Sequence, residues 1–268
     1  MPEVFEFADQ HNAQAVIKVI GVGGGGGNTV NQMVAGGIRG VDFICANTDA
    51  QHLERCNADV LVQMGNNVTR GLGAGADPSV GRQAAEQLGR IDCLVNNAAA
   101  MPVGEIETHE ESTIDQMLEV NLRAPILFSK YATPHLRGAG GGAIIHMASV
   151  TGHNGFSGIA VYGATKGALI ALARGQAIEL ANDNIRVNTV SPGTVDSPML
   201  HRFIEENADD PVQARRDFDG IHPRGTVGSI EEVAAVFVFL ASDEAANITA
   251  EDIRCDGGYA VQGTQPRG

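Results

Sequence analysis

Aromatic residues are scarce in this sequence, and acidic residues outnumber basic ones. Phenylalanine, tyrosine and tryptophan make up 4% of the 268 residues, and tryptophan is absent. So few rings argue against a nucleic-acid surface that stacks bases on aromatic side chains. The formal net charge of -14 would repel phosphate backbones and anionic membrane surfaces. We therefore expect neither nucleic acid nor a membrane among the partners.

Cysteine is also sparse: the four cysteines lie far apart and form no Cys-x-x-Cys pair. This pattern predicts reduced thiols and no metal site. The first residues are acidic and lack the pattern of a signal peptide. The longest apolar run, around residues 233–241, is too short to span a bilayer. We expect a cytoplasmic protein.

Glycine, by contrast, is abundant at 34 residues, and 43% of the residues are hydrophobic. These values suit an α/β protein with tight strand-to-helix turns and a large core. Strands are expected at residues 15–20, 41–46, 60–63, 91–95, 143–147, 185–190 and 253–255. Helices are expected at residues 29–35, 49–56, 79–88, 113–131, 161–180 and 230–240. The alternation predicts one Rossmann-type domain, a three-layer α/β/α fold whose doubly wound parallel sheet has the order 3-2-1-4-5-6-7.

Several short motifs follow one another between residue 89 and the C-terminus. They are Asn96-Asn97-Ala98-Ala99, Asn121, Ser149, Tyr162-x-x-x-Lys166, Pro192-Gly193 and Asp256-Gly257-Gly258. Their order and spacing resemble the short-chain dehydrogenase/reductase family. The resemblance implies oxidation of a secondary alcohol to a ketone with a nicotinamide cofactor. The mixed composition of residues 195–224 favours a polar substrate, such as a sugar or polyol.

The proposed chemistry also follows from the residue types. A free tyrosine has a pKa near ~10, too high for an efficient base at neutral pH. Lys166 lies one helical turn after Tyr162 on the same face, so its charge is expected to lower the pKa of the phenol. Ser149, at the end of the fifth strand, would hydrogen-bond the same substrate oxygen. A strand-end cap is the alternative for Ser149.

The resemblance assigns further roles. It implies that Lys166 binds the nicotinamide ribose and that Asn121 holds a water in a proton relay, although Asn121 also suits a polar position on a helix. It implies that Asn96 contacts the adenosine ribose, with Ala98 in the same cofactor loop.

The segment after the sixth strand carries the remaining expectations from the family. Pro192 and Gly193 would shape the nicotinamide pocket, and Thr194 would reach the carboxamide or the diphosphate. Residues 195–224 mix apolar and charged side chains; the resemblance implies a substrate lid, and an amphipathic pair of surface helices is the alternative. His146 and His153, which flank Ser149, are expected to be structural.

Residues 15–87 carry a different set of motifs. They are Gly21-Val22-Gly23-Gly24-Gly25-Gly26-Gly27-Asn28 after a strand, Ala46-Asn47-Thr48-Asp49-Ala50-Gln51, and residues 69–78. These stretches closely resemble the bacterial tubulin-like cell-division GTPase FtsZ, where such loops surround the phosphates of a guanine nucleotide. The resemblance divides the chain into a GTPase-like half, residues 1–88, and a dehydrogenase-like half, residues 89–268. Two such halves suggest a chimera, engineered or assembled from fragments.

The front half offers two kinds of nucleotide site. Residues 96–102 replace the second phosphate loop of the GTPase, so GTP hydrolysis is not expected, while weak GDP or GTP binding stays open. The spacing Gly-x-Gly-x-x-Gly, placed between a strand and a helix, also fits a dinucleotide diphosphate. The loop residues expected to bind it are Gly21, Gly23, Gly24, Gly25, Gly26 and Asn28.

Asp49, after the second strand, is the candidate for the adenosine ribose, and a helix cap is its alternative. No basic residue lies in the glycine loop or directly after the second strand, which favours NAD over NADP. The resemblance further implies a homodimer or homotetramer formed through the helices around residues 112–136 and 161–180. The rivals of the dehydrogenase are a folded chimera without catalysis and a guanine-nucleotide binder.

Overall fold

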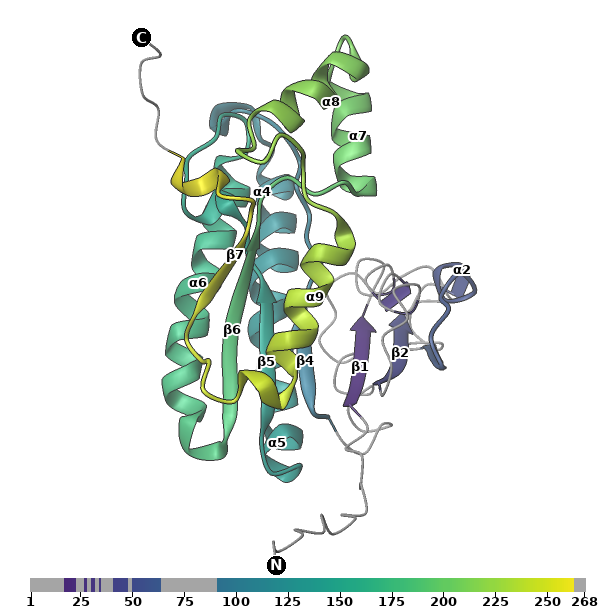
Figure 1. Cartoon of the computed structure of the whole chain (residues 1–268), viewed down its shortest axis with the longest axis vertical. Coiled ribbons are helices and arrows are strands. Elements are labelled where there is room, and N and C mark those ends of the chain that lie inside the picture. The colour runs from purple at the N-terminus through teal and green to yellow at the C-terminus, as the bar shows by residue number, and fades with distance from the viewer. Residues whose placement is uncertain are drawn as a thin grey trace, which may run out of the picture.

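The computed structural model describes residues 17–22, 27, 30–31, 34, 41–47, 50–63 and 91–262. The strands are β1 (Ile17–Val22), β2 (Val41–Asn47), β3 (Val60–Gln63), β4 (Cys93–Asn96), β5 (Gly142–Met147), β6 (Ile185–Pro192) and β7 (Asp252–Cys255). The main helices are α2 (Ala50–Leu53), α4 (Glu111–Leu118), α5 (Ala124–Gly138), α6 (Ala160–Leu180), α7 (Pro198–Asn207), α8 (Pro211–Gly220) and α9 (Ile230–Ala241). The predicted α/β class is confirmed (Figure 1).

All strand pairs in the described residues are parallel, and they form the ladders β1-β2-β3 and β4-β5-β6-β7. Strand β1 lies beside β4 (Figure 1), so the predicted order 3-2-1-4-5-6-7 is met. The prediction of one continuous sheet is wrong in one respect: no hydrogen-bonded ladder joins β1 to β4 among the described residues. The break falls between the two expected halves of the chain.

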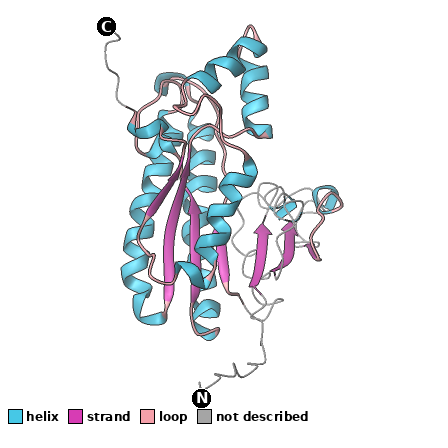
Figure 2. Cartoon of the chain, viewed as in Figure 1, coloured by secondary structure: helices cyan, strands magenta, loops and turns pink. Residues whose placement is uncertain are grey.

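Two hydrophobic clusters lie on opposite faces of the sheet, because successive strand residues point in opposite directions. Ile145 of β5 belongs to the cluster that also holds Phe237 of α9. Its neighbour Ile144 belongs to the cluster formed with α5 and α6. Helices therefore cover both faces (Figure 2), which confirms the three-layer arrangement.

The first of these clusters crosses the break in the sheet. It contains Val30, Phe43 and Cys45 from the front of the chain together with Cys93 and Phe237 from the back. Burial of apolar surface needs no hydrogen-bond register, so it can hold two ladders together where their backbones do not pair. The described parts of both halves therefore share one core.

The helix expected over residues 113–131 is divided in the structure. Helix α4 passes into a π-helical turn at Glu119–Arg123, and α5 continues from Ala124. π-Turns inside α-helices occur often at functional sites, because the extra residue re-aims a side chain. Here the turn contains Asn121, which is buried.

None of the helices in the described part of the chain has the length and apolar character needed to span a bilayer.

His146 of β5 is fully buried between two amide side chains. Its Nδ1 lies 3.0 Å from Asn96 Nδ2, and its Nε2 lies 2.9 Å from Gln176 Oε1. Burial lowers the pKa of the imidazole to about 4, although the Gln176 bond opposes this shift. His146 is thus neutral at pH 7, accepting at Nδ1 and donating at Nε2, which agrees with its expected structural role.

Acid should destabilise the fold through His146. The unfolded imidazole binds a proton below about pH 6.5, whereas the folded one stays neutral down to about pH 4. Stability therefore falls as the pH drops through this window, by up to about 3 kcal/mol. Urea unfolding of the wild type and His146→Leu across this range will test it: the variant should be less stable at pH 7 and show a shallower acid slope. Equal slopes would contradict the assignment.

Candidate active site at the carboxyl ends of the strands

Ser149 lies two residues beyond the end of β5, where the chain leaves the sheet. It caps the short 3-10 turn Val150–Gly152, and its Oγ accepts a hydrogen bond from Thr151 N at 3.2 Å. The residue is 9% exposed, and its hydroxyl is near enough to Tyr162 to favour a lower pKa of that phenol. Ser149 is therefore both a cap and a neighbour of the predicted base, so the two alternatives for this residue coexist.

Tyr162 and Lys166 lie one turn apart on the buried face of α6, at 8% and 1% exposure. Lys166 Nζ lies 5.4 Å from the centre of the Tyr162 ring and donates a hydrogen bond to Met147 O at 2.6 Å. The carbonyl at the end of β5 thus fixes the amine beside the phenol.

The electrostatics of this pair differ from the expectation. Burial raises the pKa of Tyr162 to about 12, and the Ser149 hydroxyl only partly opposes this. Burial also lowers the pKa of Lys166 to about 7. The expected lowering of the phenol pKa is therefore wrong for this structure, because desolvation disfavours both charged forms. At neutral pH the phenol keeps its proton.

Asn121 connects three segments of the site. Its Oδ1 accepts from Ala100 N at 2.7 Å, and its Nδ2 donates to Ala100 O at 2.8 Å and to Thr165 Oγ1 at 3.1 Å. Thr165 Oγ1 in turn donates to Tyr162 O at 2.7 Å. The side chain thus holds the loop after β4 against α6. Thr165 was not among the residues predicted from the sequence, although its place directly before Lys166 offered a signal.

The other predicted cofactor residues of the back half follow the strand ends. Asn96 closes β4 and is buried against His146, whereas Ala98 is exposed in the loop beyond it. Pro192 closes β6 and is buried, and Gly193 and Thr194 are half-buried in the turn that follows. Since carboxyl ends of neighbouring parallel strands lie at one edge, the structure brings Asn96, Ser149 and Pro192 to the same edge of the sheet.

The front half contributes less to the described site. Gly21 is the next-to-last residue of β1. The remaining residues predicted for the glycine loop and the ribose lie outside the described residues: Gly23, Gly24, Gly25, Gly26, Asn28 and Asp49.

The segment expected to be a lid is a pair of helices above this edge (Figure 1). Ser197 caps α7 and Asp210 caps α8, each with a proline at the start of the helix. Phe203 and Phe218 join the two helices edge to face, with ring centres 5.8 Å apart. The base of the pair is tied to the strand ends, because Gly228 N donates to Thr194 O at 2.9 Å.

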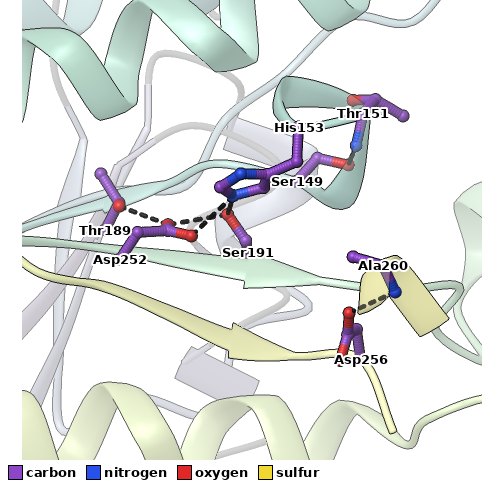
Figure 3. A network of polar contacts seen from close by, with 8 residues as sticks. All are labelled: Ser149, Thr151, His153, Thr189, Ser191, Asp252, Asp256 and Ala260. Atoms are coloured by element: carbon purple, nitrogen blue, oxygen red, sulfur yellow. Dashed lines mark hydrogen bonds and ion pairs between the residues drawn. The ribbon is translucent and has the colours of Figure 1, made fainter. Parts of the chain in front are cut away.

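A polar network that the sequence did not predict fixes the turn after Ser149 (Figure 3). His153 Nε2 lies 2.8 Å from Asp252 Oδ2 of β7. The other carboxylate oxygen, Oδ1, accepts from Thr189 Oγ1 at 2.5 Å and from Ser191 Oγ at 2.7 Å. Asp252 thus joins β6, β7 and the turn that begins at Ser149. His153 has the structural role expected of it, but its partner is 99 positions away, beyond the reach of any local motif.

Comparisons with known proteins agree with the geometry. The family profile described as enoyl-(acyl carrier protein) reductase, of the short-chain dehydrogenase type, matches residues 77–260. The cyclohexanol dehydrogenase of an Acinetobacter species is 30% identical over 91% of this chain and 94% of its own length. The aldohexose dehydrogenase structure of Thermoplasma acidophilum superimposes with a TM-score of 0.81 at 24% identity, covering 95% of this chain and 98% of that chain. The last comparison concerns the fold alone.

The front of the chain matches another family. The profile of the tubulin/FtsZ GTPase domain covers residues 16–100. The cell division protein FtsZ of Coxiella burnetii is 60% identical over 84 residues, which is 31% of this chain and 22% of that protein. The two profiles overlap at residues 77–100, around the expected join. The chain therefore belongs to the short-chain dehydrogenase/reductase family, with an FtsZ-like segment in place of the usual front of the fold.

Proposed function

We propose that this protein is an NAD-dependent oxidoreductase that interconverts a secondary alcohol, such as a sugar or polyol, and its ketone. The observation that carries the proposal is the convergence of Ser149, Tyr162 and Lys166 beside the end of β5. A hydroxyl, a phenol and an amine gathered in a buried setting provide both a clamp and a proton carrier for one substrate oxygen.

The donor set suits a nicotinamide dinucleotide. Ligands of open α/β sheets bind outside the carboxyl ends of the strands, and Lys166, Asn96 and Thr194 lie at that edge with an amine, an amide and a hydroxyl. In the proposal, Lys166 holds the nicotinamide ribose, Asn96 and Ala98 the adenosine side, and the turn at Pro192, Gly193 and Thr194 the carboxamide. When bound, the cofactor supplies the hydride acceptor or donor.

The front half would complete this cofactor site. Gly21 and the glycine loop would hold the diphosphate, and Asp49 the adenosine ribose. The lack of basic residues at these positions supports NAD over NADP.

The proton chemistry rests on the buried phenol. With its proton in place at neutral pH, Tyr162 acts as the acid that protonates the ketone oxygen, and Ser149 holds that oxygen by a hydrogen bond. In the opposite direction the phenolate takes the proton of the alcohol. Lys166 stabilises the phenolate when the amine is charged. Asn121 keeps its proposed place in a proton relay, and it also fixes the loop at Ala100.

The substrate class follows from the site and from one relative. The Acinetobacter relative is described as a dehydrogenase of cyclohexanol, a secondary alcohol. Charged residues on α7 and α8 suit a polar substrate that carries further hydroxyl groups. The four cysteines, all among the described residues, form no disulfide bond, which supports a cytoplasmic location.

A homodimer or homotetramer is also part of the proposal. The outer surfaces of the helices expected at the interface carry apolar side chains: Leu118 of α4, Ile126 of α5 and Ile178 of α6 are 42%, 41% and 77% exposed. A second copy of the chain would bury them. These apolar side chains are not buried within the core of one chain, and exposed apolar surface of this kind can mark a protein–protein interface.

Replacing Tyr162 with phenylalanine should abolish turnover while leaving cofactor binding intact. The ring still fills its buried position on α6, but the proton carrier is lost, so kcat should fall by about 10²- to 10⁴-fold. NADH fluorescence titration and a panel of secondary alcohols and polyols will test this, with Tyr131→Phe on α5 as the control. Saturable GDP binding without NADH binding would instead favour the guanine-nucleotide rival.

Alcohol oxidation should accelerate with pH, and ketone reduction should slow. Because the pKa of Tyr162 lies at about 12, the phenolate fraction grows about tenfold per pH unit below that value. Initial rates in both directions between about pH 7 and 10 will measure the two slopes. Opposite slopes to these would rule out Tyr162 as the proton carrier.

Placing a charge at the proposed interface should separate the subunits. Ile178→Glu sets a carboxylate on the part of α6 that is proposed to face the second copy, and like charges from two copies would meet there. Light scattering after size exclusion should show a smaller assembly than the wild type. The control is Val212→Glu on α8, a residue 64% exposed in the lid, which should leave the mass unchanged.

A further inference from the structure

His222 packs against the turn that follows β6, next to Gly193 and Thr194, at the base of the lid. The residue follows α8 in sequence and is 3% exposed. No motif in the sequence marks it, and it does not belong to the Ser149, Tyr162 and Lys166 group. Its ring nevertheless contacts three segments of the site.

The hydrogen bonds of His222 fix its tautomer. Nδ1 lies 2.7 Å from Phe218 O, and a carbonyl oxygen can only accept, so Nδ1 carries the proton. Nε2 is therefore the acceptor, and it receives the backbone N–H of Thr194 at 3.2 Å. One imidazole thus links the last turns of α8 to the turn that contains Thr194.

The ring of His222 also limits the space around this turn. A Cβ added at Gly193 would lie 3.0 Å from His222 Nε2 and 3.2 Å from Asp256 Cα. The turn is therefore held between the imidazole and the backbone at Asp256. The carboxylate of Asp256 accepts from Gly258 N and Ala260 N, at 2.9 and 2.8 Å, which fixes this second wall.

One aromatic ring stacks on the imidazole, and a second ring lies beside the first. The ring of Tyr259 stacks on His222 with 4.8 Å between ring centres and an angle of 27°. Phe156, from the loop after Ser149, lies 6.0 Å from Tyr259. Rotation of His222 would disturb this stack, so the ring has one well-defined orientation.

We propose that His222 is a positioning residue for the nicotinamide half of the cofactor, which it serves by holding the Thr194 amide in place. The claim that His222 holds the Thr194 amide follows from its contacts. The claim that this affects cofactor binding rests on the proposed function. The same ring binds Phe218 O, and Phe218 packs on Phe203 of α7. His222 therefore connects the lid helices to the turn that contains Thr194.

Two amide substitutions separate the two hydrogen bonds. In His222→Gln the side-chain oxygen reaches the position of Nε2, so it can still accept from Thr194 N. In His222→Asn the amide reaches only the position of Nδ1, so the bond to Phe218 O can remain and the acceptor for Thr194 is lost. His135→Asn on α5 is the control for an unrelated histidine.

Hydrogen exchange of the Thr194 amide, read by NMR in the protein without cofactor, tests the structural part. We expect exchange about tenfold faster in His222→Asn, and within about threefold of the wild type in His222→Gln. Equal exchange in the two variants would overturn the proposal. If either variant fails to fold, the ¹⁵N chemical shifts of the His222 ring in the wild type test the proposal instead. They report which ring nitrogen carries the proton, and a proton on Nε2 would exclude the hydrogen bond from Thr194 N.

NADH titration then tests the consequence. The dissociation constant should rise about tenfold in His222→Asn, with His222→Gln and His135→Asn close to the wild type. Unchanged affinity in His222→Asn, together with faster exchange, would overturn the positioning role. A wild type that binds neither NADH nor NADPH would instead overturn the proposed function, and the exchange data would still decide whether His222 holds the turn.

Discussion

The amine of Lys166 is buried beside Tyr162, and the chemistry of the site depends on how the fold tolerates it. Desolvation moves the pKa of Lys166 down to about 7 and that of Tyr162 up to about 12. The carbonyl of Met147 stabilises the amine at 2.6 Å, and thereby ties α6 to the end of β5. Near neutral pH the amine is present in both its neutral and its charged form. Small changes in the environment of the amine therefore change its charge, and with it the pKa of the phenol.

The hydrophobic core explains how two ancestries form one fold. Strands β1 and β4 lie side by side without a shared ladder in the described residues, yet Val30 and Phe43 lie in the same cluster as Phe237 of α9. Apolar contacts have no direction, whereas backbone hydrogen bonds require a register. A foreign front segment can therefore bury its apolar face against the dehydrogenase half even though β1 and β4 share no hydrogen-bonded ladder.

Buried polar side chains give the site its rigidity. Asn121, His146 and Asp252 each join segments that are distant in sequence. A buried polar group left unpaired is costly, so each of these side chains specifies one arrangement of its neighbours. The loops that follow β4 and β5 are held in this way, and they present candidate catalytic and cofactor residues.

The sequence itself determined much of the fold and of the candidate site. The alternation of strands and helices predicted the layers and the strand order. Motif spacing, a local property of the chain, predicted the group formed by Ser149, Tyr162 and Lys166. The break between β1 and β4, the π-turn at Asn121 and the role of His222 were decided only by the tertiary structure. So was the direction of the Tyr162 pKa: the sequence shows a nearby lysine, but only the folded chain shows how deeply both groups are buried. Desolvation depends on everything packed around a group, and no motif contains that information.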